Sequence, residues 1–148
     1  MVLREFRPAD LETLYRIDQA CFPPGVSYSP GELAAFIRHP FAATWIAEEN
    51  DEIVGFAIAN RDAKGAAHIV TIDVIEDRRR KGVGKALMDA VEAWAARLGF
   101  EMVYLETAES NKSAQAFYRQ RGYKKLKTIE NYYANGERAW VMVKGLRR

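Results

Sequence analysis

The sequence predicts a single domain of the α/β (α+β) class, with a mixed, mostly antiparallel sheet of seven strands flanked by about four helices. The length of 148 residues is typical of one domain, and the 49% hydrophobic content is enough for a core. Strand and helix patterns follow each other in the order β-α-α-β-β-β-α-β-α-β-β. The strand–helix–strand unit from His68 to Glu106 should be a right-handed parallel crossover, whereas the strands before it suggest an antiparallel hairpin.

In the first half of the chain, a short strand over 2–8 precedes a helix that begins near Asp10. The stretch 22–31 is rich in Pro, Gly and Ser, which is typical of a loop. Ser29 and the proline after it predict an N-cap followed by the first helical residue. Two strand patterns then flank the polar turn 49–51 and indicate a hairpin.

In the second half, a strand rich in β-branched residues covers 64–75, and the long helix after it should end at Gly99. A strand over 101–107 leads to a short helix over 111–122, with an asparagine at its start and a glycine at its end. The pair Asn135-Gly136 predicts a two-residue hairpin turn between the last two strands.

Composition and charge exclude several classes of protein. A net charge of +2 is too balanced to indicate a nucleic-acid partner. The single Cys21 permits no internal disulfide and is expected to be a small buried thiol in a reducing compartment. His39 and His68 lack the spacing of zinc ligands, and no apolar run is long enough for a signal peptide or membrane span. We therefore expect a cytoplasmic protein, monomeric or weakly dimeric, without a metal or membrane partner.

A basic, glycine-containing stretch, "IEDRRRKGVGKALM" over 75–88, runs directly into a helical pattern. A helix start leaves backbone N–H groups unpaired and carries a partial positive charge. Gly82 and Gly84 would let a ligand approach these groups closely, and the cationic side chains of 79–81 and Lys85 add positive potential. The stretch therefore predicts a site for a phosphate or pyrophosphate.

The spacing alone does not identify the phosphate ligand. A P-loop is excluded because Arg79 replaces its first glycine and Ala86 follows Lys85 in place of Ser or Thr. A dinucleotide fingerprint requires Gly or Ala where Leu87 stands, although Glu106 supplies a carboxylate at a later strand end. A dinucleotide site and a solvated basic loop both stay open on this evidence.

Two motifs carry a resemblance to a known family. "RRKGVG" resembles the R/Q-x-x-G-x-G/A loop of the GNAT superfamily of acyl-CoA-dependent N-acyltransferases. "NKSAQAFYRQRGY" is similar to the N-x-x-A-x-x-F/L-Y-x-x-x-G-F/Y helix of that superfamily, and the resemblance covers essentially the whole chain. Within it, the RimI-type N-terminal (ribosomal-protein alanine) acetyltransferases are most similar, through the stretches "IDQACFP", "YSPGELAAFI", "YLETAESN" and "NYYANGERAWVM".

The resemblance implies an acetyl-CoA site. In the family, the loop amides bind the pyrophosphate, the exposed backbone of the preceding strand pairs with pantetheine, and an asparagine bonds the pantetheine arm. The N–H of Val74 would lie near the thioester oxygen. The residues implicated are Ile72, Asp73, Val74, Arg79, Arg80, Lys81, Gly82, Val83, Gly84, Lys85, Asn111 and Tyr118.

The resemblance also implies catalytic roles. Tyr118 would be the general acid beside the coenzyme sulfur; the alternative is a helix tyrosine half-buried against the sheet. Glu106 would be the general base, acting through water, or else an ordinary strand-end carboxylate. Asp73 departs from the family pattern of a small apolar residue, and in the cleft it would act as a base, bind a cationic substrate or pair with an arginine. Glu109 and His68 are weaker base candidates.

Aromatic side chains are expected to line the acceptor site, with Tyr132 and Tyr133 on one wall and Tyr28 or Phe22 on the other. The alternative for the tyrosine pair is strand packing, because tyrosine favours strands. Because adjacent residues face opposite sides, at most one of the two is expected to point into the cleft. Glu106 is also expected to contact the acceptor.

The function expected is direct transfer of acetyl from acetyl-CoA to the N-terminal α-amine of a peptide or protein, with a ribosomal protein as one candidate acceptor. One alternative is the same fold acting on a small amine or a lysine side chain. The other is a non-catalytic acyl-CoA-binding module.

Overall fold

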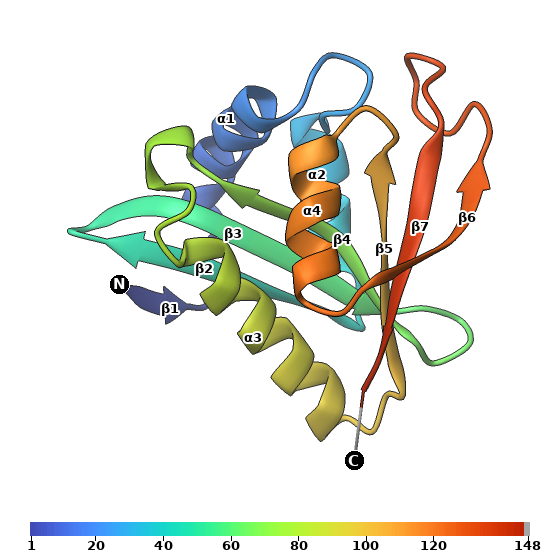
Figure 1. Ribbon diagram of the computed structural model, residues 1–148. Coiled ribbons are helices and arrows are strands. Elements are labelled where there is room, and N and C mark those ends of the chain that lie inside the picture. The colour runs from blue at the N-terminus through green and yellow to red at the C-terminus, as the bar shows by residue number, and fades with distance from the viewer. Residues whose placement is uncertain (147–148) are drawn as a thin grey trace.

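The computed structural model describes residues 1–146, which contain seven strands and four α-helices in the predicted order. The strands are β1 (Val2–Arg4), β2 (Ala42–Glu49), β3 (Glu52–Arg61), β4 (Ala67–Val74), β5 (Met102–Ala108), β6 (Lys124–Ile129) and β7 (Ala139–Gly145). The helices are α1 (Leu11–Cys21), α2 (Pro30–Arg38), α3 (Val83–Arg97) and α4 (Lys112–Gln120). Within residues 1–146 the strands form one sheet in the order β1-β2-β3-β4-β5-β7-β6, in which only the β4–β5 pair is parallel (Figure 1). The predicted mixed, mostly antiparallel sheet is confirmed.

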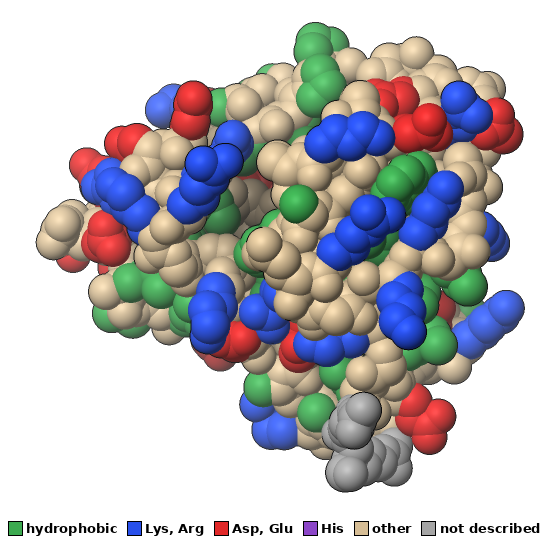
Figure 2. All heavy atoms as spheres, viewed as in Figure 1, with side chains coloured by type: hydrophobic (Ala, Val, Ile, Leu, Met, Phe, Trp, Pro, Cys, Tyr) green, Lys and Arg blue, Asp and Glu red, His purple; other side chains and the backbone are tan. Residues whose placement is uncertain are grey.

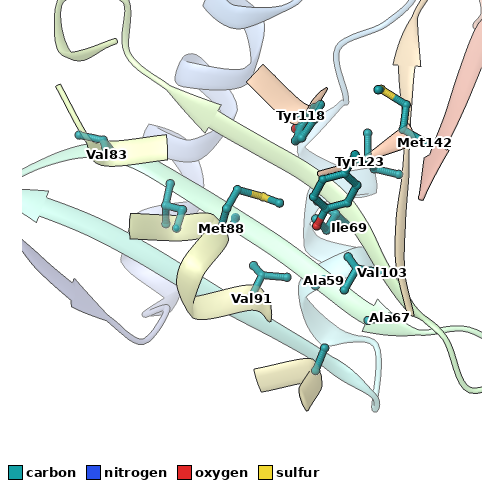
Figure 3. Close-up of a cluster of buried hydrophobic side chains, with 14 of the residues drawn as sticks. Ala59, Ala67, Ile69, Val83, Met88, Val91, Val103, Tyr118, Tyr123 and Met142 are labelled. Atoms are coloured by element: carbon teal, nitrogen blue, oxygen red, sulfur yellow. The ribbon is translucent and has the colours of Figure 1, made fainter. Parts of the chain in front are cut away.

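The sheet separates two layers of helices. Helices α1 and α2 cover one face, and α3 and α4 cover the other (Figure 1). On the first face Leu14 and Leu33 pack with Phe56, and on the second Met88 and Val91 lie within a larger apolar cluster (Figure 3). Each such fully buried side chain contributes about 1.5–3 kcal/mol of transfer free energy, so the core fixes both helix layers against the sheet.

The helix ends follow local signals in the sequence. The Ser29 hydroxyl accepts a hydrogen bond from Glu32 N at 3.1 Å, and the Glu32 carboxylate accepts one from Ser29 N at 2.9 Å. This capping box begins α2 as predicted. Gly99 has φ of +80° just after α3, and Asn111 Oδ1 caps α4 by accepting from Ala114 N at 3.2 Å. These predicted ends are confirmed.

Strands β4 and β5 separate over most of their length. In the part of the chain that the structure describes, the only residue pairs between these strands join Ala67 to Val103 and His68 to Tyr104. On its other side β4 follows β3 throughout, but Val70 is an extra residue without a partner on β3. Such a bulge bends a strand and increases its twist. Beyond His68, therefore, one edge of β4 is left without a neighbouring strand, and a gap opens in the middle of the sheet.

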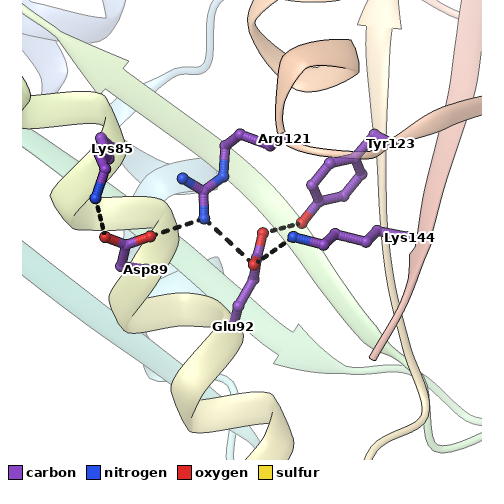
Figure 4. Close-up of polar contacts among 6 residues, drawn as sticks. All are labelled: Lys85, Asp89, Glu92, Arg121, Tyr123 and Lys144. Carbon is purple, nitrogen blue, oxygen red and sulfur yellow. Dashed lines mark hydrogen bonds and ion pairs between the residues drawn. The ribbon is translucent and has the colours of Figure 1, made fainter. Parts of the chain in front are cut away.

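A polar network on the α3–α4 side bridges this gap from outside (Figure 4). Glu92 of α3 accepts hydrogen bonds from Lys144 Nζ at 2.8 Å and from the Tyr123 hydroxyl at 3.0 Å. Arg121 Nη2 lies 3.2 Å from the same carboxylate and donates to Asp89 at 2.9 Å. Since these partners come from α3, from the end of α4 and from β7, the network ties the two halves of the sheet together.

Replacing Glu92 with alanine should lower the free energy of unfolding by about 2–4 kcal/mol, because the charged groups of Arg121 and Lys144 would lose their shared, largely buried partner. Urea titration measures the loss. The control is Glu12→Ala, which removes only an exposed i,i+4 pair with Arg16 and should cost less than about 0.5 kcal/mol. Equal losses in the two variants would contradict the role of the network.

One predicted element is wrong. The sequence predicted a two-residue hairpin at Asn135-Gly136, but β6 ends at Ile129 and β7 begins at Ala139. The tight turn exists, with Gly136 at φ of +86° and its N–H bonded to Tyr133 O, but it lies inside a longer loop. Ala134 N in this loop bonds to Gly25 O, so the β6–β7 loop is held against the α1–α2 connection.

Candidate functional site

The site forms where the gap between β4 and β5 is reached from both faces of the sheet. The loop before α3 and the side chain of Tyr118 lie on the α3–α4 face. Glu106 and three tyrosines gather on the opposite face, beside the α1–α2 and β6–β7 loops. A space-filling view shows a hollow beside α4 with basic side chains at its rim (Figure 2).

The loop before α3 has an unusual backbone shape. Arg80 has φ of +64° and Gly82 has φ of +89°, so the chain turns sharply before the helix begins at Val83. A β-carbon placed on Gly82 would meet no atom within 4 Å, so the space in front of it is open. The first N–H groups of α3 point into this space without intrahelical acceptors. The predicted loop residues Arg79, Arg80, Lys81, Gly82, Val83, Gly84 and Lys85 thus lie together in this turn and the first residues of α3.

The individual loop residues make different contacts. Gly84 lies against Phe117, since a β-carbon there would come within 3.3 Å of that ring. This glycine allows α3 and α4 to approach each other. Val83 is buried in the core, so only its backbone is available. The Lys85 ammonium pairs with Asp89 at 2.9 Å, while Arg79 Nε donates to Val74 O at 3.1 Å.

The free edge of β4 ends at a cluster of polar contacts. Val74 O accepts from Arg79 and also from the Cys21 thiol, whose sulfur lies 3.4 Å away. Burial raises the pKa of the Cys21 thiol to about 11, with the Asp73 carboxylate adding to the effect. The cysteine is thus protonated at neutral pH, in agreement with the predicted inert thiol. Ile72 and Val74 direct their side chains toward the cluster under α3 and α4.

Tyr118 enters the site from α4. Its side chain is only 6% exposed and makes edge contacts with the rings of Phe117 and Tyr123. Burial raises the pKa of its hydroxyl, and the Asp73 carboxylate raises it further. Tyr118 therefore keeps its proton at neutral pH, as a general acid must. Asn111, predicted to contact the coenzyme, uses its side-chain oxygen for the α4 cap, and the amide nitrogen is the group left for a ligand.

Glu106 is hydrogen-bonded to His68, which was the weaker candidate for the general base. His68 Nε2 lies 2.7 Å from Glu106 Oε1, and the ring nitrogen must carry the proton of this bond because a carboxylate can only accept. The His68 ring stacks on Tyr104 at 4.6 Å, and the Tyr132 hydroxyl lies close enough to Glu106 for the two groups to interact electrostatically. The pair depends on the parallel register of β4 with β5, which sets His68 opposite Tyr104, and no local sequence pattern specifies that register. Glu109 instead pairs with Arg138 at 3.2 Å.

Tyrosines surround the Glu106 carboxylate. Burial, followed by the charge of Glu106, raises the pKa of Tyr132 to about 12. Burial, the neighbouring tyrosines and Glu106 also raise the pKa values of Tyr28 and Tyr133. The rings of Tyr132 and Tyr133 meet edge to face at 4.9 Å. The expectation that only one of them faces the site was wrong in its premise, because both lie in the β6–β7 loop and strand alternation does not apply.

Two predicted site residues lie differently from the others. Phe22 is the residue after α1 and is only half-buried, at the start of the α1–α2 loop. The Asp73 side chain is 1% exposed and faces α1, where it bonds to Thr71 and contacts Asp18. The roles considered for the Asp73 side chain depended on its facing the cleft. Because this side chain is almost fully buried against Thr71 and Asp18, it does not line an open cleft. Asp18 itself was missed, although it interrupts the apolar stripe begun by Leu11 and Leu14.

Other site types are absent from the described residues. Within 1–146, no group of three or more His, Cys, Asp or Glu side chains could hold a metal ion. No helix in the same residues is long and apolar enough to cross a membrane.

Comparisons with known proteins show which family and fold this chain resembles. A model described as "Acetyltransferase (GNAT) family" matches residues 11–123. An N-alpha-acetyltransferase of Sulfurisphaera tokodaii is 30% identical over 154 aligned positions, which cover 95% of this chain and 90% of that protein. Arabidopsis thaliana Naa50, solved with the bisubstrate analogue CoA-Ac-MVNAL, is 27% identical with a TM-score of 0.83 and 98% coverage of both chains. The ribosomal-protein-S18-alanine N-acetyltransferase of Escherichia coli shares the fold, with a TM-score of 0.86, 24% identity, and coverage of 99% and 94%.

Proposed function

The chain belongs to the acetyltransferase (GNAT) family and is an N-acetyltransferase that uses acetyl-CoA, and on this premise we propose that its acceptor is the N-terminal α-amine of a peptide or protein. The observation that carries the proposal is the gap between β4 and β5. Tyr118 reaches it from one face, and the hydrogen-bonded Glu106–His68 pair lies on the other. Relatives named N-alpha-acetyltransferase, such as the Sulfurisphaera tokodaii protein, support this choice of acceptor.

The residues around the gap fit a coenzyme A thioester. The open space before Gly82 and the unpaired N–H groups at the start of α3 suit a pyrophosphate. The free backbone edge from Ile72 to Val74 suits an extended chain with amide groups, and the amide nitrogen of Asn111 can bind the same chain. When bound, acetyl-CoA supplies an acetyl group activated as a thioester. The N–H of Val74 is our candidate donor to the carbonyl oxygen that gains negative charge.

Glu106 removes the proton of the attacking amine in this proposal, directly or through one water. The bond with His68 at 2.7 Å holds its carboxylate in one orientation. An α-amine titrates near 8 and a lysine near 10.4, so the former requires less help from a base. Tyr118 donates a proton to the departing sulfur. Transfer is direct, because no nucleophilic side chain of the chain is needed between donor and acceptor.

Replacing Tyr118 with phenylalanine should lower kcat roughly tenfold while binding of acetyl-CoA persists. The loss is moderate because a thiolate with a pKa near 8.5 is a fair leaving group even without a proton donor. Steady-state kinetics and thermal stabilisation by acetyl-CoA measure the two effects. Tyr15→Phe, in α1 and outside the site, is the control and should change neither quantity. A Tyr118→Phe variant with native kcat would remove the tyrosine from the mechanism.

The acceptor is tested with a peptide library of free and acetyl-blocked N-termini, each with and without an internal lysine. We expect transfer to free N-termini only. Peptides that begin with ribosomal-protein sequences belong in the library, since the RimI-type resemblance makes such proteins candidate acceptors. Full activity on blocked, lysine-containing peptides would show lysine acetylation instead. Stabilisation by acetyl-CoA without transfer to any amine would show a binding module.

A further inference from the structure

Two carboxyl groups face each other in the apolar layer between α1 and β4. Asp18 lies on α1 and is 0% exposed, and Asp73 lies on β4 and is 1% exposed. Their neighbours include Ile17 on α1 and Phe56, which pairs with Asp73 across β3 and β4. Burial of carboxyl groups among such residues strongly disfavours the charged form.

The hydrogen bonds around the pair leave one oxygen free on each side chain. Thr71 Oγ1 donates to Asp73 Oδ1 at 2.6 Å, and Tyr28 N donates to Asp18 Oδ2 at 2.7 Å. Among residues 1–146, the remaining atoms Asp18 Oδ1 and Asp73 Oδ2 have no N–H or O–H donor. The two carboxyl groups are within hydrogen-bonding reach of each other. Two ionised carboxylates can only repel at this range, so a bond between them requires one proton.

The charged and titratable groups near the pair do not neutralise it. Arg79 acts on Asp73 through its charge but makes its hydrogen bond to Val74 O. Glu32 of α2 adds negative charge near Asp18. The Cys21 thiol and the hydroxyls of Tyr28 and Tyr118 are uncharged neighbours whose own pKa values the pair raises. Burial, followed by the neighbouring carboxylate, raises the pKa of Asp73 well above its ordinary value, against the effects of Thr71 and Arg79.

We propose that Asp18 and Asp73 share one proton, and that this hydrogen bond positions the acceptor wall against the strand that holds the thioester. The pair joins the two parts directly. Asp18 holds the backbone of Tyr28, which forms the acceptor wall, and Asp73 lies between Ile72 and Val74 on the free edge of β4. The two aspartates are positioning residues, and this role rests on the proposed acetyl transfer.

The geometry selects the variants for a test. In Asp73→Asn, the amide oxygen accepts from Thr71 and the amide nitrogen donates to Asp18 Oδ1, which reproduces the protonated acid. In Asp18→Asn, the amide oxygen accepts from Tyr28 N and the amide nitrogen donates to Asp73 Oδ2, which also reproduces the protonated acid. In the double variant two amide nitrogens face each other, so one of the outer bonds must be lost. The double variant should therefore have a kcat/KM at neutral pH about tenfold below that of either single variant.

The pH dependence has a definite sign. A folded-state pKa above the unfolded value means that the native state holds a proton that the unfolded chain has released. The stabilisation is complete below the unfolded value near 3.9 and declines as pH rises toward the folded pKa. In the native protein, loss of the proton would set two carboxylates against each other and separate the Tyr28 wall from β4. Asp73→Asn has no such proton to lose.

The experiment compares Tm and kcat/KM of the native protein and Asp73→Asn from pH 4 to pH 10. The Tm of the native protein should fall relative to that of Asp73→Asn as pH rises, and its kcat/KM should decline at alkaline pH where that of the variant stays level. Asp62→Asn is the control for Tm: burial of Asp62 is outweighed by bonds from Ala66 N and Lys64 N, which lower its pKa. The Tm of the native protein minus the Tm of Asp62→Asn should therefore rise with pH, not fall.

A constant Tm difference between the native protein and Asp73→Asn would overturn the shared proton. A pH-dependent Tm difference with identical alkaline profiles of kcat/KM would overturn the positioning role. The Tm series needs no acceptor, so it decides the shared proton even if no peptide is acetylated. If the native protein acetylated no amine but showed the expected pH-dependent Tm difference, the proposed function and the positioning role would be rejected. The shared proton would still be established.

Discussion

Replacing Glu106 with glutamine is expected to lower kcat for a free N-terminal peptide by about 100-fold or more, the usual contribution of a general base. The amide has the shape of the carboxylate and can still accept the bond from His68, which lies 2.7 Å away in the native protein. It cannot accept a proton from the amine. Because the change is nearly isosteric, Tm and stabilisation by acetyl-CoA should stay close to native values.

The matched control for this variant is Glu109→Gln. Glu109 is the next acidic residue along the chain, follows the end of β5, and pairs with Arg138 at 3.2 Å. Its replacement should change kcat by less than about threefold. If Glu109→Gln lost activity and Glu106→Gln kept it, the base would have been assigned to the wrong carboxylate.

Replacing Gly82 with alanine is expected to raise KM for acetyl-CoA by about 100-fold, because the loop amides would no longer converge on one anion. Gly82 has φ of +89°, which costs an alanine about 1–2 kcal/mol. The added methyl group would also project into open space, where no protein atom lies within 4 Å. Titration with acetyl-CoA, followed by thermal shift, measures the affinity separately from turnover.

Gly65→Ala separates backbone strain from loss of the binding surface. Gly65 lies between β3 and β4 with φ of +83°, and a β-carbon there would also meet nothing within 4 Å. Both variants should lose similar stability, but only Gly82→Ala should lose affinity for acetyl-CoA. Equal affinities in the two variants would contradict the assignment of the loop as the pyrophosphate site.

The sequence predicted those features that depend on local chemistry. The caps at Ser29 and Asn111 and the end of α3 at Gly99 follow from a few adjacent residues. The loop before α3 was predictable for the same reason, since glycine at positive φ next to a helix start has a recognisable pattern. The coenzyme itself could be named only through the resemblance, because phosphate-binding geometry is shared by unrelated ligands.

Features that depend on contacts between distant segments were not predictable from local patterns. The β6–β7 connection is held by a bond from Ala134 N to Gly25 O, more than a hundred positions away in the chain. The Glu106–His68 pair depends on the register of two parallel strands. Asp18 and Asp73 are each ordinary acidic residues in the sequence, and their meaning appears only when α1 is packed on β4.

The separation of β4 from β5 has a mechanical consequence. Within residues 1–146, β4 and β5 are joined only by the pairs at Ala67 and His68, so the sheet consists of two half-sheets with a gap between them. The Glu92 network connects the two half-sheets on the α3–α4 face. A coenzyme whose amide groups bond to the free edge of β4 would fill the gap between the two half-sheets. It would extend the hydrogen bonding of the sheet as an eighth, non-protein strand. Product release would then require the hydrogen bonds between β4 and the coenzyme to break. The rigidity of the gap between β4 and β5 would therefore govern how quickly the enzyme can begin another turnover.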